Sequence, residues 1–578
     1  MIGLAPLLLA AQLGAAGRGG AAGDAPAREP APAGAAAEPA AAGIATAGAP
    51  DEAPNEAPDE ADLADEALER RGAVIDHVTV RVGDIFDPAL PGEDRALFRW
   101  ANHLHRETRD GVIRRQLLFA PGDRYSRRVL EESERLLRAD PYLYDATIRP
   151  VRRHDGDRVD VEVVTRDVWT LDAGLSFGRK GGANSTRFKV EDTNVLGTGM
   201  LLALEHSDGV DRSGNELRFA DPNLFGGRAR LDLGYADNSD GAAWHLRAGR
   251  PFFALDSRWA AEVSALDDDR VDSRYLRGRA TDRFRHRERE LELSAGLSRG
   301  LRAGGADRWT AGVTYARHLF APAAGEPAPA DLPADRTLVY PWIGFEHVED
   351  AWIEDTDLDK IGRTEDLFVG RSLRARVGYS SPLLGGDRGR LLFDGAVRAA
   401  WELPGEQLVD LSAHAGGRWG DGGAEDVVIG AGVAYHRRDF GRNVFFARLS
   451  ADAASRLDLD HQLALGGDNG LRGYPLRYQD GDRRWLLTLE QRVVTGWRPF
   501  HLVQVGAAVF FDAGRSWFAD GRGDGPGGGV LTDVGIGLRL GHTRSGRGSM
   551  IHLDLAFPLD GDRSIASPQW LISSKQSF

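Results

Sequence analysis

Alternation of apolar with small or charged residues runs through the chain from residue 170 to its end. Residues 231–235, 373–379 and 551–557 each present one apolar and one polar face, and turns rich in Gly, Asp and Asn separate such segments. A period of two is that of a β-strand whose two faces meet different surroundings. About twenty such segments can be marked, each of about ten residues, which is the length that a tilted strand needs to cross a bilayer.

Two kinds of β structure alternate in this way. A soluble sandwich is normally divided into modules of about 100 residues around their own cores, whereas a membrane barrel turns its apolar face to lipid and carries aromatic residues at both interfaces. Here no linker interrupts the pattern, and aromatic residues recur near segment ends. The pattern favours a transmembrane antiparallel β-barrel over 170–578. The charged or Pro-rich stretches 270–287, 321–335 and 350–365 are predicted to be long loops, on the outer side rather than among the periplasmic turns.

The segment 73–169 has the pattern of a small α/β domain. Residues 74–82 alternate as a strand, and 96–118 carry apolar residues at helical spacing. A second helix is predicted after Ser126, a candidate N-cap, and a hairpin of two strands is predicted over 146–164. The predicted order is strand, helix, helix, strand, strand.

The residues before this domain do not predict a fold. Residues 1–16 form an apolar run that ends in small residues and is too short to span a membrane, so we interpret it as a signal peptide, although no Lys or Arg precedes it. Residues 17–72 are almost all Ala, Pro, Gly, Glu and Asp and cannot bury enough apolar surface to fold, which predicts a disordered linker. No other stretch approaches the length of a transmembrane helix.

Composition narrows the possible functions. The 578 residues include 72 Gly and 13 Trp, with a net charge of −15 and a mean hydropathy of −0.35. Hydropathy alone indicates a soluble acidic protein, but a barrel hides only alternate residues in lipid and keeps a polar lumen. The acidic balance argues against nucleic-acid binding. The absence of Cys excludes disulfides, thiol catalysis and cysteine-ligated metal sites.

A glycine-rich stretch carries the most specific chemistry. Residues 466–475 read GGDNGLRGYP, which predicts a sharply folded loop with Arg472 at its tip and with Gly473 allowing the backbone to pass closely behind it. In the two strands that follow, turning the alternate apolar residues to lipid turns Glu490 and Asp512 to the lumen. A guanidinium pairs strongly with carboxylates, so these two are its candidate partners.

These features resemble the BamA/TamA-like outer-membrane assembly and two-partner-secretion superfamily. The segment 73–169 looks like a single POTRA domain, and LLFAPGDRY at 117–125 is similar to the loop before its second helix. GGDNGLRGY resembles the superfamily's sixth-loop motif, and VFFDAG at 509–514 resembles the partner motif on the following strand. The chain ends in an alternating strand with Trp570 and a terminal Phe578, as in the targeting signal of outer-membrane barrels.

The resemblance implies a mainly β fold, with a barrel of sixteen strands in the outer membrane and one small α/β POTRA domain in the periplasm. It also implies that a loop at 466–480 folds into the barrel and that its arginine pairs with the two lumenal carboxylates. The implied loop-to-lumen residues are Arg472, Gly473, Tyr474, Glu490 and Asp512. Without the resemblance, they would be scattered charges in the lumen of a water-filled pore.

Two classes of function remain. By resemblance, the chain inserts or translocates polypeptides: its periplasmic domain receives unfolded clients as added strands, and a weak seam between the first and last barrel strands lets them enter the membrane or pass outward. The alternative is a passive pore or structural barrel with the loop as a plug. A two-partner secretion transporter ranks lower, because that group usually carries two POTRA domains and a plug helix. A seam of few hydrogen bonds between Leu171–Lys180 and the last strand favours the first class.

The expected partners are outer-membrane lipid, unfolded polypeptide clients and periplasmic accessory proteins, without nucleic acid, and the barrel is expected to be monomeric. No enzymatic activity, cofactor or metal is expected. GLSRG at 296–300 fits the serine-hydrolase elbow but continues an alternating strand. Residues 355–360 have calcium-loop spacing but place Lys360 where the turn needs Gly. The 15 histidines are dispersed, without an HExxH motif.

Overall fold

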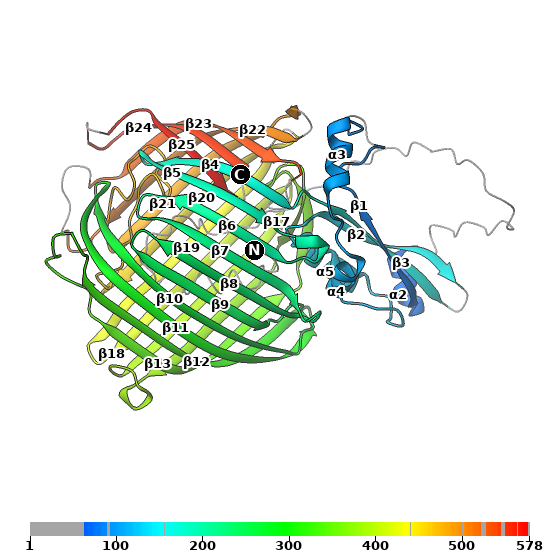
Figure 1. The fold of residues 1–578 in the computed structure, drawn as a ribbon, viewed down its shortest axis with the longest axis horizontal. Coiled ribbons are helices and arrows are strands. Elements are labelled where there is room, and N and C mark those ends of the chain that lie inside the picture. Colours follow the sequence, from blue (N-terminus) through cyan, green and yellow to red (C-terminus); the bar gives the residue numbers. More distant parts are fainter. Residues whose placement is uncertain are drawn as a thin grey trace.

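The computed structural model describes residues 63–575 except for 90–92, 155–156, 440, 500–501, 522–527, 545–549 and 563–564. A small α/β domain and a large β-barrel follow one another along this part of the chain (Figure 1). The predicted signal peptide, most of the predicted linker and Phe578 lie outside the described residues.

The N-terminal domain is a three-stranded sheet with helices packed against it. β1 lies parallel to β3, and β2 lies antiparallel to β3, so the sheet order is β1-β3-β2. Val112, Ile113, Leu130, Ile148 and Val161 are fully buried between helices and sheet. The elements are α2 Asp65–Arg71, β1 Val74–Gly83, α3 Ala96–Leu104, α4 Asp110–Gln116, α5 Arg127–Arg138, β2 Leu143–His154 and β3 Arg158–Asp167.

Apolar spacing over 96–118 predicted one helix, but the structure has two, α3 and α4. Residues 105–109 between them are not helical, because Asp167 at the end of β3 binds this connection. Its carboxylate accepts hydrogen bonds from Thr108 N at 2.8 Å and Thr108 Oγ1 at 2.9 Å, and it lies 2.7 Å from His105 Nε2. The periodicity of apolar residues gives no information about a hydrogen-bond partner that lies so far away in the sequence.

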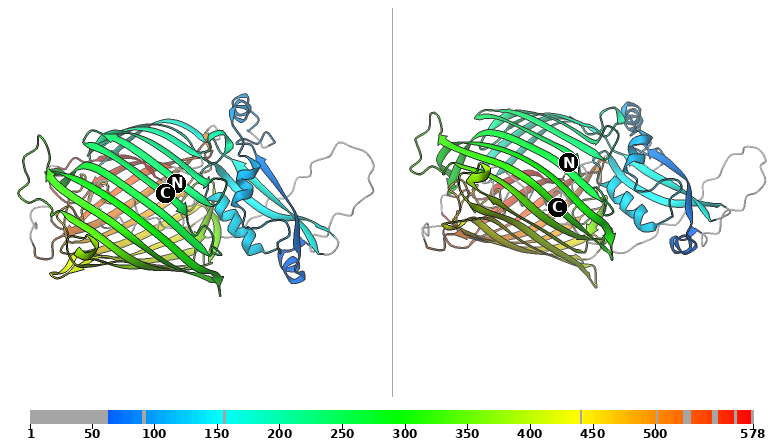
Figure 2. Two further views of the ribbon diagram at one scale, coloured as in Figure 1. Left: turned by 60° about the horizontal axis from the view of Figure 1, so that its bottom comes forward. Right: turned by 90° about the horizontal axis from the view of Figure 1, so that it is seen from below.

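Twenty strands of the described residues close into one antiparallel barrel (Figures 1 and 2). They follow chain order around the wall until the last strand returns beside the first. The count of about twenty from the alternation is confirmed, and the sixteen strands implied by resemblance are wrong. Each strand that crosses the membrane has its own segment of alternating apolar and polar residues. The number of such segments therefore gives the number of strands in this chain.

The strands of the barrel are β4 Leu171–Lys180, β5 Ala183–Asp192, β6 Leu201–Asp208, β7 Ser213–Leu224, β8 Ala229–Asn238, β9 Gly241–Arg250, β10 Trp259–Leu276, β11 Arg279–Arg302, β12 Gly305–Pro322, β13 Arg336–Glu349, β16 Arg371–Ser380, β17 Arg390–Leu403, β18 Gln407–Gly420, β19 Gly423–Asp439, β20 Asn443–Ser455, β21 Arg483–Val494, β22 Val503–Trp517, β23 Leu531–His542, β24 Met550–Pro558 and β25 Gln569–Lys575. Short 3₁₀ turns η3 Val195–Gly197 and η4 Pro382–Leu384 lie between strands.

The apolar face of the alternating strands points away from the barrel. Leu175, Leu297 and Trp309 are 78%, 71% and 59% exposed, whereas the charged Asp512 and Arg539 are fully buried on the inner side. This distribution is the reverse of that in a soluble protein and suits an outer surface in contact with lipid. Among the described residues, no helix is both long enough and apolar enough to cross a bilayer.

The composition of the charged stretch 270–287 predicted a loop, but the structure has paired strands there. This stretch forms the outer part of the hairpin of β10 and β11, whose strands stay paired up to Leu276 and Arg279. Ion pairs across the ladder, such as Arg285 with Asp269 at 2.7 Å, match these charges. Opposite charges facing each other stabilise a ladder, so the composition extends the strands instead of ending them. The stretch 321–335 does contain the connection between β12 and β13.

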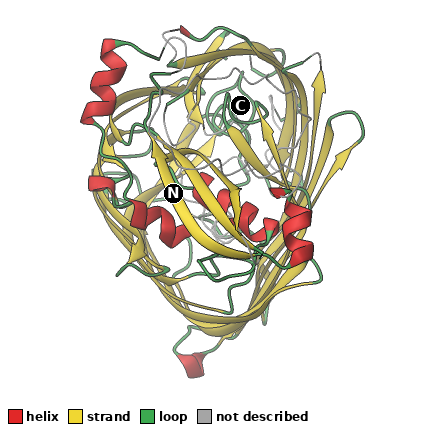
Figure 3. Ribbon diagram, turned by 90° about the vertical axis from the view of Figure 1, so that its right-hand side faces the viewer, coloured by secondary structure: helices red, strands yellow, loops and turns green. Residues whose placement is uncertain are grey.

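The stretch 350–365 lies beside the N-terminal domain and not on the outer side. It contains β14 Trp352–Thr356 and the first residues of β15 Thr364–Phe368, which pair with each other as a hairpin. β13 is the tenth strand of the barrel, and after an even number of crossings the chain is back at the end where β4 began. Figure 3, viewed from this end, shows the helices and sheet of the domain lying across the barrel.

Candidate functional site

The connection between β20 and β21 folds back into the barrel from the end far from the N-terminal domain. We call residues 456–482 the inward loop. Its Leu465, Leu471 and Tyr474 are fully buried. The Tyr474 hydroxyl donates to Thr532 O at 2.7 Å, and burial raises the pKa of this tyrosine to about 12. Apolar contacts and a phenol that stays protonated at neutral pH therefore hold the loop inside the barrel.

Gly473 lies directly against the barrel wall. A Cβ added at this position would lie 2.7 Å from Asp533 Cβ and 3.0 Å from Pro558 N, which is too close for any side chain. The Gly473 N–H donates to Asp533 Oδ2 at 3.0 Å. The glycine next to the arginine is thus required by the close approach of the two backbones.

Arg472 binds both Glu490 and Asp512, the two carboxylates that the alternation of the strands predicted to face the lumen. Its Nε and Nη2 donate to the two oxygens of Asp512 at 2.7 and 3.0 Å, and its Nη1 donates to Glu490 at 2.9 Å. The ring of Phe510 lies 3.3 Å from the guanidinium carbon. Two parallel bonds to one carboxylate fix the orientation of an arginine as well as its charge. The structure thus brings Arg472, Glu490 and Asp512 together.

Further charges of this cluster were missed by sequence reasoning. Arg539 on β23 is fully buried, bonds to Asp554 on β24 and lies 3.5 Å from Glu490. Arg492 lies 3.4 Å from the same glutamate. Their inward phase in alternating strands was a usable signal, but phase alone does not tell which lumenal charges meet across the barrel.

The inward loop also contacts turns at the far end of the barrel. Leu476 N donates to Gly181 O at 3.3 Å, in the turn between β4 and β5. Arg477 pairs with Asp211 at 2.8 Å, in the turn between β6 and β7. The loop therefore ties the first strands of the barrel to the last ones, where its arginine is held.

The hairpin of β14 and β15 lies between the N-terminal domain and the barrel interior. On the domain side, Arg138 bonds to Asp366 and lies 2.6 Å from Glu354. On the barrel side, Arg492 lies 3.3 Å from Asp359, and Ile361 packs among apolar residues of the barrel strands. This segment contacts both units, so we call residues 350–370 the linking hairpin.

The first and last strands of the barrel meet through little pairing. Among the described residues, Ile572 opposite Arg179 is the one residue pair in register between β25 and β4. The neighbouring ladders, β4 with β5 and β24 with β25, hold ten and seven pairs. Trp570 on the last strand is exposed on the outer surface. The seam is thus the weakest joint of the described barrel wall.

Comparison with known proteins identifies the N-terminal domain. Residues 104–166 match the POTRA family model, described as "Surface antigen variable number repeat". No curated protein sequence matches the chain. Similar solved structures include BamA from Haemophilus ducreyi lacking POTRA domains 1–3, with 13% identity, coverage of 88% of this chain and 85% of that chain, and a TM-score of 0.37.

Two further similar structures are those of CdiB. The protein from Acinetobacter baumannii is 12% identical, with coverage of 87% of this chain and 73% of that chain and a TM-score of 0.44. The protein from Escherichia coli is 13% identical, with coverage of 87% and 77% and a TM-score of 0.42.

The assignment of the chain rests on the POTRA match and on its own fold. A POTRA domain at 104–166 precedes a closed antiparallel barrel whose outer surface is apolar. The chain is therefore a transmembrane β-barrel preceded by a domain that matches the POTRA family.

Proposed function

We propose that this chain inserts polypeptides into the outer membrane, or moves them across it, through the seam between β4 and β25. Its sequence motifs resemble those of an outer-membrane assembly and two-partner-secretion superfamily, which handles polypeptides. The observation that carries the proposal is the single described residue pair at the seam. A ladder held by one pair costs little free energy to separate, and its two edges then offer unpaired backbone groups to a client strand.

The inward loop is the element we assign to controlling the seam. On one side of the seam it contacts Gly181, next to β4, and on the other side the Tyr474 hydroxyl lies 3.2 Å from Asp560 O, next to β24. A loop that contacts both sides limits their separation. Arg472, Gly473 and Tyr474, with Glu490 and Asp512, are in this proposal the residues that set how firmly the loop is held.

The POTRA domain is the proposed receiving surface for clients. β1 and β2 are the edge strands of its sheet, and an extended polypeptide can add to such an edge by main-chain hydrogen bonds. In this proposal residues 1–16 direct export, the predicted linker acts as a spacer up to α2, which belongs to the domain core through Leu68, the domain from α2 to residue 169 receives the client, and 170–578 form the barrel. The chain acts as a monomer in lipid, with unfolded polypeptides and periplasmic accessory proteins as partners.

A passive pore is the alternative in a different class. It requires a lumen that is continuous from one end to the other, and the inward loop and the linking hairpin each extend into that lumen from opposite ends. A two-partner secretion transporter remains a narrower form of the translocation proposal, because the seam and the loop would serve outward passage equally.

Photocrosslinking at the seam tests the proposal. The crosslinking residue p-benzoylphenylalanine replaces Leu175 on β4, which is 78% exposed, or, as a matched control, Ile343 on β13, which is 57% exposed and far from the seam in strand order. Irradiation of cells is expected to yield polypeptide adducts at 175 and lipid adducts alone at 343, as read by mass spectrometry. A passive pore predicts the same adducts at both positions, and that result would overturn the proposal.

A further inference from the structure

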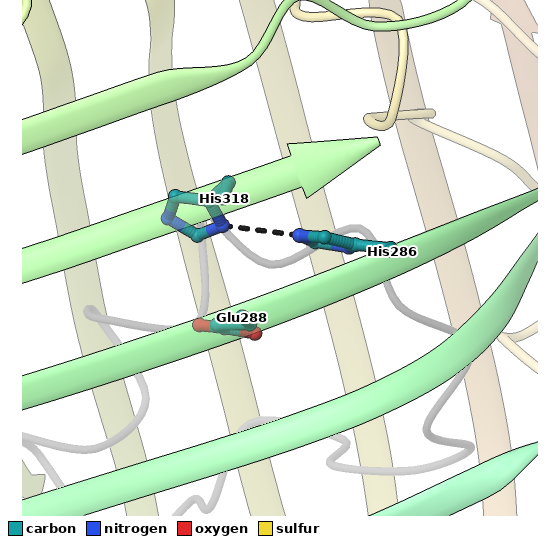
Figure 4. Close-up of side chains that lie close together, drawn as sticks. All are labelled: His286, Glu288 and His318. Atoms are coloured by element: carbon teal, nitrogen blue, oxygen red, sulfur yellow. Dashed lines mark hydrogen bonds between the residues drawn. The ribbon is translucent and has the colours of Figure 1, made fainter. Parts of the chain in front are cut away.

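Two histidines and a glutamate gather on the inner face of the barrel, away from the cluster around Arg472. His286 and Glu288 are two residues apart on β11 and therefore share one face of the strand. His318 on β12 is the ladder partner of Glu288. Figure 4 shows the three side chains on these neighbouring strands, with a nitrogen of one imidazole directed at a nitrogen of the other.

The spacing of these groups suits a metal ion. His286 Nε2 lies 3.1 Å from His318 Nδ1, and one ligand atom from each of the three residues lies within 4.8 Å of the others. Two nitrogens bound to a tetrahedral Zn²⁺ at 2.0–2.1 Å are about 3.3 Å apart, so a small adjustment would let both rings bind one ion. Two imidazoles and one carboxylate are a ligand set that Zn²⁺ accepts with a fourth position open.

A carboxylate orients one of the two rings. His286 Nδ1 lies 2.7 Å from Asp272 Oδ2, the closer of its two polar neighbours, since Arg270 Nη2 lies at 3.0 Å. A proton on Nδ1, shared with Asp272, leaves the lone pair on Nε2 directed at His318. Histidines that bind metals are commonly held in this way by a carboxylate on the opposite nitrogen.

Several carboxylates gather beside the rings. The carboxylates of Asp268, Asp272 and Glu288 all lie within 3.0 Å of one guanidinium, that of Arg270. Arg212 is 3.6 Å from Asp268 but bonds to a carboxylate of its own. A divalent cation bound by Glu288 would lie beside these carboxylates, in a site where His286 and Glu288 are 2% exposed.

We propose that His286, Glu288 and His318 bind one Zn²⁺ ion. Arg270 donates to Glu288 Oε2, and the carboxylate offers its second oxygen, Oε1, to the metal. The ion joins β11 to β12 near the far end of the barrel, where Arg336 on β13 is held by Asp460 of the inward loop at 2.6 Å. The aromatic ring of Phe320, stacked on His286 at 4.4 Å, covers the site.

Metal titration of the purified full-length barrel in detergent tests the site. The protein is stripped with a chelator and titrated with Zn²⁺ alone by calorimetry, and with Co²⁺ to read the visible absorption of a tetrahedral centre. All proteins carry His77→Ala, because Asp76, His77 and Asp160 form a second, exposed group in the POTRA domain. One Zn²⁺ per chain and a tetrahedral Co²⁺ spectrum are expected.

Variants assign the ion to these residues. His286→Gln, His318→Gln and Glu288→Gln are each expected to abolish the Co²⁺ spectrum, and Asp272→Asn to weaken Zn²⁺ binding by about 10–100-fold as a positioning residue. His347→Gln is the matched control, because His347 pairs with Asp307 at 2.7 Å on the same barrel and belongs to neither of the candidate metal groups found among the described residues. Heat-modifiable gel migration verifies that each variant is folded. Absence of tetrahedral Co²⁺ in the parent protein, or its persistence in folded His318→Gln, would overturn the proposal.

Discussion

At the scale of single residues, one arginine organises the lumenal cluster. Arg472 comes from the inward loop, while its partners Asp512 and Glu490 come from two adjacent barrel strands. All three are screened from water, and a buried ion pair contributes mainly by keeping each partner from being buried alone. The cluster therefore makes the position of the loop depend on a complete set of charges.

Replacement of Arg472 by Ala is expected to destabilise the barrel. Buried Asp512 would lose its bidentate cation, and Glu490 would lose one of the three guanidiniums beside it, at a cost of about 3–5 kcal/mol. The midpoint temperature of heat-modifiable gel migration should fall clearly, and Arg472→Lys should recover part of the loss, since an ammonium supplies charge without the two-pronged geometry. Arg437→Ala is the control, because this arginine pairs with Asp439 on the exposed surface. Equal midpoints for Arg472→Ala and Arg437→Ala would contradict the role given to Arg472.

The sequence predicted residues of the Arg472 cluster only where a local pattern placed them, either the alternation of a strand or a glycine-rich loop. Glu490 and Asp512 follow from strand phase, and Arg472 from its glycine-rich loop. The proposed zinc ligands were missed because the search was for two histidines on one helical face. His286 and His318 instead meet across two strands, and they are 32 residues apart in the sequence.

At the scale of elements, the linking hairpin is the part that sequence analysis placed wrongly. Its charges indicated a solvated loop, but its contacts are with the POTRA domain and the barrel interior, which lie far from it in the sequence. Glu365 on β15 accepts hydrogen bonds from Leu358 N and Lys360 N at 2.9 and 3.1 Å. Burial, with the nearby Asp359 carboxylate, raises the pKa of Glu365 to about 8.

This pKa predicts that the linking hairpin loosens as pH rises. The docked state favours protonated Glu365, so the stabilisation is complete below the ordinary pKa of 4.5 and is lost as pH rises through about 8. Hydrogen–deuterium exchange over 352–368, corrected for the intrinsic pH dependence of exchange, should show less protection at pH 8 than at pH 5.5. Glu365→Gln should remove most of this difference. Equal protection of the wild-type hairpin at both pH values would refute the prediction.

At the scale of the whole molecule, the barrel is closed, but the extent of strand pairing differs around its wall. In the part of the chain that the structure describes, neighbouring strands pair along extended ladders except at the seam, where Ile572 opposite Arg179 is the one pair in register. The inward loop enters the lumen from the far end, and the linking hairpin enters it from the end that carries the POTRA domain. The alternation predicted the barrel and the number of its strands. It could not predict how firmly the first strand pairs with the last, because pairing between chain ends leaves no periodic trace in the sequence.

Locking the seam is the most direct test of the central claim. The chain has no Cys, so Arg179→Cys with Ile572→Cys introduces one possible disulfide between residues in register, and Phe177→Cys with Thr186→Cys does the same within the ladder of β4 and β5 as a control. The outer-membrane abundance of the polypeptides that crosslink at position 175 is measured in oxidised and reduced cells. If polypeptides pass the seam, abundance falls in the oxidised seam variant to the level of cells that lack the chain, recovers on reduction and is unchanged in the control. Normal abundance with the seam fully disulfide-bonded would contradict the account.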